Sequence, residues 1–442
     1  MPEPRISPGP EPKPFTAAQR GFLAFPSIHV TMLRWACAVR DIVFQGFTGA
    51  GQRKRWMAFG KDRAIAFRMS MPSLTTPAAR TLTNDKHQTK ATLARHGIPV
   101  PDGTRIGSGE IDAALAWFEA QNGAPTVVKP IDGRGGKGVT TSIVDADDLI
   151  RAMQGAGHGT VVLERFVPGQ DHRILVVGGR YVAAIRRHPA SVIGDGRSSV
   201  RELIAQKNEV RRHNPYAGHK PLSLAGDVPA HLAKAGLTAA SVPARGQQVR
   251  LRGVSNIALG GDSEDVTDLV HPDFIALAET TWESLPGLAF CGIDLIAQDI
   301  SLPVAGQPCA VIEVNANADV AMHHFPTIPG RRAPVDVAGA IIDYVFPEQP
   351  PAERHALSLT IRGTVQRVGY LTWLRWQAAA LGITGYATSR EDDALRVHLE
   401  GTRAALDEVV RRCATGSHKS KVTAMEYQDC AVEGHDAFTV RV

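Results

Sequence analysis

Hydrophobic and polar positions follow two successive patterns along the chain. From about residue 84 to 348, short apolar runs with strand character alternate with helical stretches, which is typical of a mixed α+β domain. Pro347, Pro350 and Pro351 then interrupt the pattern. They predict a linker at 349–356, because proline disfavours the interior of both helices and strands.

Residues 357–442 carry the second pattern, in which one strand, one helix, two strands, one helix and one strand follow each other. The expected strands are LSLTIRGTV, GYATS, ALRVHLEG and KVTAMEYQ, and the expected helices are TWLRWQAAALG and ALDEVVRRCATG. This βαββαβ order predicts a small α+β sandwich of the ferredoxin-like type.

The chain before residue 84 is less regular. Residues 1–19 begin with the proline-rich stretch MPEPRISPGPEPKPF, a composition typical of disorder. Residues 20–83 form a separate region ahead of the α+β domain. The longest apolar stretch of this region, FLAFPSIHVTMLRWACAV, is broken by Pro26, His29 and Arg34. It therefore predicts a buried segment, and we expect no membrane partner.

Composition narrows the class of protein only slightly. The length of 442 residues indicates about two to four domains. The five cysteines show no paired spacing and follow no signal peptide, which indicates free thiols in the cytoplasm and argues against a structural zinc site. A net charge of +5 suits anionic partners, including nucleotides and nucleic acid, and selects none of them.

The glycine-rich stretch VVKPIDGRGGKGV covers residues 127–139. Its GRGGKG fits the dinucleotide fingerprint, but the following VTTSIV favours a strand, where that fingerprint requires a helix. A Walker A loop is excluded because Gly138, and no Ser or Thr, follows Lys137. The stretch predicts a hairpin whose backbone N–H groups close over phosphates. A flexible hairpin without a ligand is the alternative.

Several charged residues lie inside apolar strands. Lys129 lies in TVVKPI, and Arg173 and Arg186 lie in the two strands expected within DHRILVVGGRYVAAIRRHP. An unpaired buried charge is costly, so we expect each of these side chains to face an anion. A snorkelling lysine at a sheet edge and surface salt bridges are the alternatives.

Two more strands carry a candidate metal site. Asp294 lies in the middle of LAFCGIDLIAQDI, and Glu313 and Asn315 share one face of the strand in PCAVIEVNANAD. The short connection SLPVAGQ allows the two strands to pair. Two carboxylates and an amide oxygen then form a set that suits Mg²⁺. The alternative is that each carboxylate pairs with an arginine.

These motifs, in this order, resemble the ATP-grasp superfamily, in particular the ATP-grasp domain of cyanophycin synthetases and, more distantly, glutathione synthetases and D-alanine–D-alanine ligases. The matching segments run from TNDKHQTKATLARHGIPVPDG to VIEVNANADVAMHHFP and cover about 84–348. The resemblance implies an ATP-grasp fold, in which two α+β lobes clasp ATP.

The resemblance also implies roles for single residues. The phosphates of ATP would meet Lys86, Lys129, Gly135, Gly136 and Gly138. Adenine would meet Glu164, Arg165, Phe166 and Val167, and the ribose would meet Asp171. Mg²⁺ or Mn²⁺ would be held by Asp294, Glu313 and Asn315. The catalytic set would be Arg173, Arg186, Asn256, Gly260 and Gly261, which orient the reacting groups and seat an acyl phosphate.

The implied chemistry is ligation of a carboxylate to an amine through an acyl phosphate, with an amino acid or a short peptide as substrate. Phosphotransfer without ligation is the alternative. Cyanophycin synthetases continue into a Mur-ligase-like domain with a P-loop, which this sequence lacks, so we do not expect it to make cyanophycin alone. Their N-A-A-P-G pattern is Asn315-Ala-Asn317-Ala-Asp319 here, which leaves the substrate open.

Residues 357–442 resemble acylphosphatases in strand order and in the motifs IRGTVQRVGYL and LGITGYATSREDDALRVHLEG. In that family an arginine grips the phosphate and an asparagine positions water. Leu371 and Ser389 occupy these two positions here, and Arg367 replaces a loop glycine. Because leucine cannot bind phosphate, we expect no acylphosphatase activity. We expect this domain to bind an acidic part of the substrate or to pack against the ligase.

The basic runs RKRWMAFGKDR and KNEVRRHN raise nucleic-acid binding as a further hypothesis. They lack the interleaved aromatic residues of RNA-binding sheets, so we expect solvated surfaces and no nucleic-acid partner. Family members of this type often form dimers or tetramers, and we expect a homo-oligomer here too.

Overall fold

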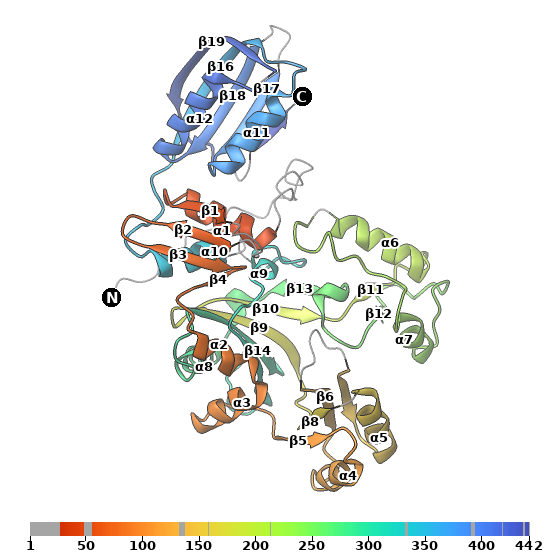
Figure 1. Ribbon diagram of the computed structural model, residues 1–442. Coiled ribbons are helices and arrows are strands. Elements are labelled where there is room, and N and C mark those ends of the chain that lie inside the picture. The colour runs from red at the N-terminus through yellow and green to blue at the C-terminus, as the bar shows by residue number, and fades with distance from the viewer. Residues whose placement is uncertain are drawn as a thin grey trace.

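The computed structural model describes residues 27–47, 55–131, 138–157, 159–212, 214–331, 335–389, 394–417, 419–435 and 438–441. Residues 1–19 and the hairpin residues Gly135 and Gly136 lie outside these ranges. Figure 1 shows a central sheet with the N-terminal strands above it, smaller lobes beside and below it, and the C-terminal domain at the top. Within the described ranges, no helix combines the length and the apolar character that crossing a membrane requires.

The N-terminal region contains a helix and an antiparallel sheet with the order β1-β2-β3-β4. Its elements are α1 (Ile28–Ala38), β1 (Val43–Phe47), β2 (Arg55–Phe59), β3 (Ala64–Arg68) and β4 (Met71–Pro72). Helix α10 (Val337–Val345) packs against α1, and Arg40 Nε donates to the Asp343 carboxylate at 2.7 Å. Buried side chains from Val30 to Phe67 share one hydrophobic core with the central sheet.

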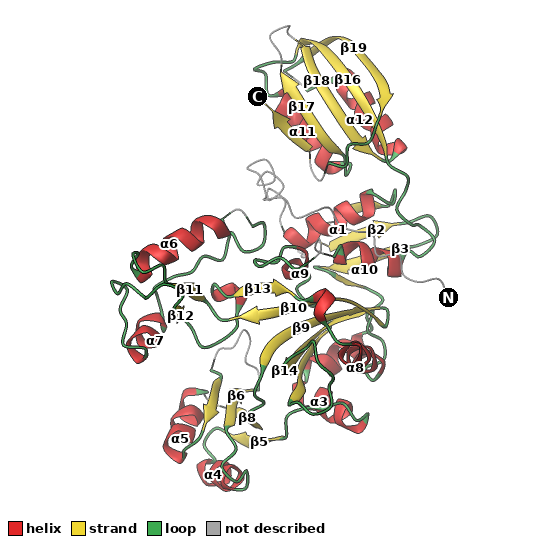
Figure 2. Cartoon of the chain, turned by 180° about the vertical axis from the view of Figure 1, so that it is seen from behind, coloured by secondary structure: helices red, strands yellow, loops and turns green. Residues whose placement is uncertain are grey.

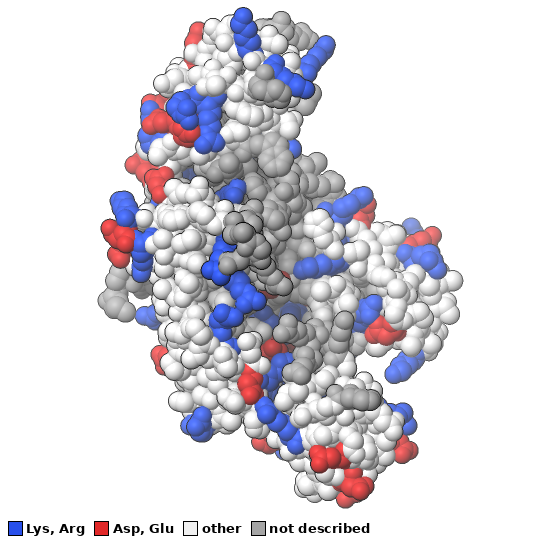
Figure 3. Space-filling model, viewed as in Figure 1, with Lys and Arg blue, Asp and Glu red and all other residues white. Residues whose placement is uncertain are grey.

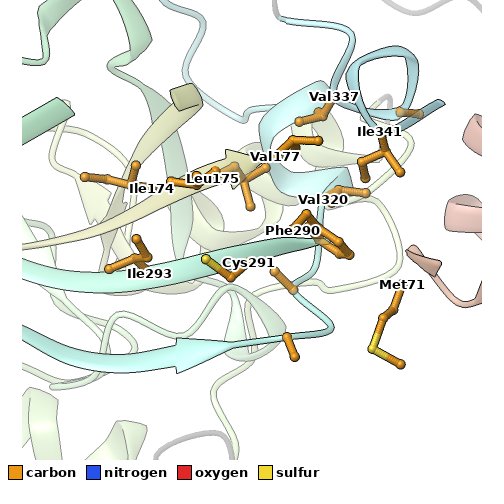
Figure 4. Close-up of a cluster of buried hydrophobic side chains, with 14 of the residues drawn as sticks. Met71, Ile174, Leu175, Val177, Phe290, Cys291, Ile293, Val320, Val337 and Ile341 are labelled. Carbon is orange, nitrogen blue, oxygen red and sulfur yellow. The ribbon is translucent and has the colours of Figure 1, made fainter. Parts of the chain in front are cut away.

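The central sheet is antiparallel, with the order β13-β10-β9-β14-β15. Its strands are β9 (Gln170–Val177), β10 (Arg180–His188), β13 (Asp262–Asp265), β14 (Phe290–Ala297) and β15 (Cys309–Asn315). Helix α8 (Pro272–Glu283) covers the face that carries Ile174 and Ile293. Leu175 and Val177 lie on the other face, toward α10, as Figure 4 shows. The sheet is therefore covered on both faces along most of its length.

Two short helices precede the lower lobe. They are α2 (Pro77–Asn84) and α3 (Lys86–Arg95). The carboxylate of Asp85 accepts from the N–H groups of His87 and Gln88 at 3.0 Å and caps α3, which satisfies donors that the first helical turn leaves free. The chain leaves α3 through Gly97, whose φ is +74°. Helix α3 therefore has a capped start at Asp85 and ends before a glycine.

The lower lobe is a sheet with the order β5-β8-β6-β7, visible at the bottom of Figure 2. Its elements are β5 (Gly103–Gly107), α4 (Ile111–Glu119), β6 (Thr126–Pro130), β7 (Thr140–Ile143), α5 (Ala146–Gly155) and β8 (Thr160–Arg165). Strands β6 and β7 pair in antiparallel fashion around the glycine stretch, which confirms the predicted hairpin.

A second lobe follows the C-terminal end of β10. It contains β11 (Ser191–Ile193), α6 (Val200–Arg211), α7 (Val228–Lys234) and β12 (Gln248–Arg250), followed by the 3-10 helices η2 (Ile257–Leu259) and η3 (Thr267–Leu269). The lobe has its own small apolar core around Val200, Leu232 and Val249. Helix α9 (Ala321–His324) follows β15 on the way to α10.

The C-terminal domain has the sheet order β19-β16-β18-β17-β20. Its elements are β16 (His355–Thr364), α11 (Tyr370–Ala380), β17 (Thr384–Ser389), β18 (Ala394–Gly401), α12 (Arg403–Thr415), β19 (Lys421–Cys430) and β20 (Phe438–Arg441). The predicted βαββαβ order is confirmed. Strand β20, which pairs parallel with β17, was not predicted, because four residues are too few to reveal a period of two.

The central core provides a test of the fold. Ile293 of β14 is 1% exposed, whereas Ile193 of β11 is 55% exposed. We expect Ile293→Ala to lower the free energy of unfolding by about 2–5 kcal/mol, because it leaves a cavity in the core. Ile193→Ala makes the same chemical change on the surface and should cost less than about 1 kcal/mol. Urea unfolding measures both, and equal losses would contradict the packing described for β14.

Candidate active site

Residues singled out in the sequence gather where the lower lobe meets the central sheet. Lys129 comes from the lobe, Lys86 from α3, and Asp294 and Glu313 from the sheet. Figure 3 shows Lys and Arg side chains along the hollow on this side of the molecule. A hollow lined with positive charge attracts anions such as phosphates.

Two buried lysines converge on one buried carboxylate in this hollow. Lys129 Nζ of β6 lies 2.5 Å from one carboxylate oxygen of Glu164 of β8, and Lys90 Nζ of α3 donates to the other oxygen. Burial raises the pKa of Glu164, but the two lysines outweigh burial and the pKa lies below its usual value. Burial and then the charge of Lys129 lower the pKa of Lys90 to about 7.

This cluster contains Lys129, which was expected to face an anion, and Lys90, which the sequence analysis did not select. Lys129 does face an anion, and within the chain that anion is Glu164. Sequence reasoning did not single out Lys90, although Lys90 follows Lys86 by four residues and therefore lies on the same side of α3. Glu164 was expected to meet adenine, yet in the structure its side chain makes the central contact of the two lysines.

A second charged cluster lies on the sheet face that carries Leu175. Arg173 of β9 and Asp294 of β14 are register partners, and the guanidinium donates two hydrogen bonds to the carboxylate. Arg187 of β10 donates to Asp171 at 2.6 Å and lies 3.2 Å from Asp294. Burial raises the pKa of Asp294, but Arg173 and Arg187 outweigh burial and lower it overall.

The structure does not bring Arg186 to this cluster. Arg186 is the register partner of His172, so its side chain lies on the opposite face from Arg173. There it forms two hydrogen bonds of 2.8 Å with the Glu264 carboxylate. Its neighbour Arg187, which the sequence analysis did not select, takes the place beside Asp171 and Asp294.

The predicted oxygen ligands are neighbours across two strands. Asp294 pairs with Glu313 and Gly292 pairs with Asn315 in the β14–β15 register, which confirms that these strands bring the residues together. Lys86 Nζ lies 3.7 Å from Glu313. Two carboxylates and an amide oxygen are the donors that divalent cations such as Mg²⁺ prefer. The set therefore fits such an ion, provided that Arg173 turns away from Asp294.

Backbone contacts fix two segments near the site, the linker 164–167 and the loop that follows β12. The N–H groups of Arg165 and Phe166 donate to the carbonyls of Asp102 and Pro125 at 2.8 and 2.7 Å. These two N–H groups of the linker are thus already paired within the chain. In the other loop, a Cβ on Gly261 would come within 2.6 Å of the His188 carbonyl.

Gly260 and Asn256, which were predicted together with Gly261, also shape this loop. Gly260 has a φ of +93°, a conformation that glycine adopts without strain. The Asn256 side chain accepts from the Ala258 N–H at 2.8 Å and so caps η2. These contacts fix the loop against the end of β10.

A third cluster brings the N-terminal region to the site. The Tyr216 hydroxyl donates to Asp319 at 2.5 Å, and His29 Nε2 of α1 lies 3.6 Å from the same carboxylate. Lys220 Nζ lies 3.1 Å from the centre of the Tyr216 ring, and burial lowers its pKa to about 8. Sequence reasoning missed Tyr216, Lys220 and the role of His29, because His29, the stretch with Tyr216 and Lys220, and Asp319 come from three separate segments.

The loop of the C-terminal domain departs from its family pattern in the way the sequence indicated. Arg367 has a φ of +57°, so an arginine occupies a left-handed conformation that favours glycine. Leu371, at the arginine position, packs against the domain's hydrophobic core. Ser389 lies at the exposed end of β17. No cationic side chain therefore stands at position 371.

Comparisons with known proteins agree with this architecture. Residues 83–206 match the model of the RimK-like ATP-grasp domain, and residues 357–440 match the acylphosphatase model. The chain thus combines an ATP-grasp region with an acylphosphatase-like domain, as the two resemblances implied.

Relatives in sequence are synthetases and bifunctional enzymes. The chain is 37% identical to a cyanophycin synthetase of Trichormus variabilis over 282 residues, which are 62% of this chain and 30% of that protein. It is 35% identical over 274 residues to the glutathione biosynthesis bifunctional protein GshAB of Mannheimia succiniciproducens, covering 60% of this chain and 35% of that protein. The matched part therefore spans about a third of the length of these relatives.

A solved structure supports the fold. The bifunctional glutathione synthetase from Pasteurella multocida superposes with a TM-score of 0.54 at 28% identity, over 71% of this chain and 43% of that one. The ATP-grasp fold predicted from the motifs is confirmed.

The buried lysine pair yields a prediction on stability and pH. We expect Glu164→Gln to lower the free energy of unfolding by about 3–5 kcal/mol, because it leaves two buried ammonium groups without a counter-charge. The loss should shrink as the pH rises above about 7, where Lys90 gives up its proton. Exposed Glu209, which pairs with Arg212, provides the matched control Glu209→Gln. Urea unfolding at pH 6 and 9 measures both variants, and a pH-independent loss would contradict the prediction.

Proposed function

We propose that this chain is an ATP-dependent ligase that joins a carboxylate to an amine through an acyl phosphate. The observation that carries this proposal is the pair Lys90 and Lys129, already desolvated and held by Glu164 at the junction of the lower lobe and the sheet. Amino groups that folding has already placed at this junction can stabilise the charge of a phosphate. The identity to a cyanophycin synthetase and to a glutathione biosynthesis protein supports ligation over simple phosphotransfer.

In this proposal the lower lobe and the linker bind ATP, and the central sheet binds the metal ion and the reacting carboxylate. Lys90 and Lys129 bind the phosphates of ATP, the hairpin β6–β7 covers them, and the 164–167 linker and Asp171 hold the nucleoside. Asp294, Glu313 and Asn315 hold Mg²⁺ or Mn²⁺, which supplies charge neutralisation at the transferred phosphate when bound. Arg173, beside Asp294, orients the reacting carboxylate, whose oxygen attacks the γ-phosphate. The amine then attacks the acyl carbon and phosphate leaves.

The cluster of His29, Tyr216, Lys220 and Asp319 marks the side on which the acceptor is selected. It contains Asp319 of the loop in which this chain departs from the cyanophycin synthetase pattern. A lysine whose pKa is lowered to about 8 can hold or release a proton near neutral pH. We therefore place an amino acid or a short peptide there, in a cytoplasmic enzyme with free thiols.

One assay tests the proposal. Purified protein is mixed with Mg-ATP and pools of amino acids and dipeptides, and phosphate release and mass spectrometry are measured together. We expect ADP and a new mass equal to two substrates minus water. Lys129→Ala and Glu313→Ala should each lower kcat/KM by about 100-fold or more, whereas exposed Lys234→Ala and Glu348→Ala should not.

The other outcomes of this assay are also informative. ADP with a phosphorylated substrate and no condensed product would favour the phosphotransferase alternative. Turnover that survives Lys129→Ala and Glu313→Ala would contradict the proposed site.

The family match of residues 357–440 makes acylphosphatase activity the second candidate. Because Leu371 packs into the core and Arg367 occupies the loop, we expect the chain to hydrolyse acetyl phosphate no faster than buffer does. Phosphate release measures this rate. Hydrolysis that disappears when residues 352–442 are deleted would contradict the expectation.

A further inference from the structure

The C-terminal domain has a face that its helices leave open. Side chains of Leu395, Val397 and Leu399 point into the core on the helix side, so His398 and Glu400 point to the other face of β18. Strands β19 and β20 form opposite edges of this sheet. The connecting residues 431–435 leave one edge toward the other and lie against Glu400 on the open face.

Glu400 fixes that crossing segment. Its carboxylate is fully buried and accepts from the N–H groups of Glu433, Gly434 and His435 at 2.6, 3.1 and 3.0 Å. It also lies 2.9 Å from His398 Nε2. With four hydrogen bonds, its oxygens are largely occupied.

The contact with Glu400 decides the orientation of His398. A proton on Nε2 donates to the carboxylate, so the lone pair of Nδ1 points away from it. On that side, His398 Nδ1 lies 3.5 Å from Cys430 Sγ and 3.9 Å from a carboxylate oxygen of Glu433. His435 Nε2 lies 2.9 Å from the other oxygen of Glu433, and the two imidazole rings are 5.4 Å apart.

Part of this set has the spacing of a tetrahedral metal site: the His398 Nδ1–Cys430 Sγ distance of 3.5 Å equals that between neighbouring ligands, and the distances of 2.9 and 3.9 Å to Glu433 lie on either side of it. Ligand atoms of His398, Glu400 and His435 also lie within 4.8 Å of one another. Zinc bonds of about 2.0–2.1 Å to nitrogen and about 2.3 Å to sulfur place neighbouring ligand atoms about 3.4–3.6 Å apart. A thiolate with two carboxylates, opposed by Arg354 at 3.7 Å from Glu400, balances a divalent charge. Two imidazoles and a thiolate favour zinc over Mg²⁺.

We propose that His398, Cys430, Glu433 and His435 bind a divalent metal ion of the zinc class, with Glu400 orienting His398. The site is separate from the candidate active site and does not depend on the proposed ligase activity. It departs from the expectation drawn from cysteine spacing, because it uses one cysteine and two histidines that the strands bring together. The metal would hold the crossing segment, and with it β20, against the sheet.

The test uses the full chain after chelation. Zn²⁺ is titrated by calorimetry and counted by mass spectrometry, and Co²⁺ serves as a spectroscopic probe whose thiolate charge-transfer band reports Cys430. All proteins carry Glu313→Gln, so that binding at the candidate active site is removed. We expect one equivalent of Zn²⁺, a rise in Tm on binding, and about 100-fold weaker binding in His435→Gln and Cys430→Ser.

Matched controls separate binding from folding. His355→Ala, in the same domain but outside the cluster, should bind Zn²⁺ as the parent does. His435 and Cys430 are only partly buried, so their variants should keep the parent's circular dichroism spectrum. Absence of Zn²⁺ binding in the parent, or binding that survives both cluster variants, would overturn the proposal and leave the cluster as a polar clamp.

Discussion

The structure around the candidate site depends on the compensation of buried charge. An isolated ammonium or carboxylate pays a large desolvation cost inside a protein, so Lys90, Lys129 and Glu164 can be buried only together. They come from α3, β6 and β8, and their contact therefore also fixes α3 against the lower lobe. A triphosphate that binds at this junction would find these ammonium groups already placed by folding, next to the Glu164 carboxylate that they also compensate.

The central sheet obeys the same constraint on one of its faces. Asp171, Arg173, Arg187 and Asp294 compensate one another there, next to the apolar residues that pack under α10. The opposite face holds the separate pair Arg186 and Glu264. Because side chains alternate along a strand, two consecutive arginines in β10 necessarily serve different faces. The two arginines consequently belong to separate ion-pair networks on opposite faces of the sheet.

Much of this arrangement could be predicted from local patterns. The hairpin, the pairing of Asp294 with Glu313 and the βαββαβ order follow from periodicity and short connections. The choice between Arg186 and Arg187 could not be predicted, since the register of β10 shifts between Tyr181 and Ala183 and an apolar strand does not reveal which face is charged. Val30 shares one hydrophobic core with the central sheet. This contact could not be predicted either, because it joins segments that are far apart in the sequence.

The C-terminal domain contacts the same N-terminal helix, α1, that carries His29. It is held against the end of α1, where Thr402 Oγ1 donates to Asp41 at 2.7 Å and a Cβ on Gly382 would meet Ala38 at 2.4 Å. The same helix carries His29 at its other end, beside Asp319. The domain carries Leu371 where the acylphosphatase motif has an arginine, and it has its own core and this contact with α1. Its contact with α1 therefore links the domain structurally to the ATP-grasp region.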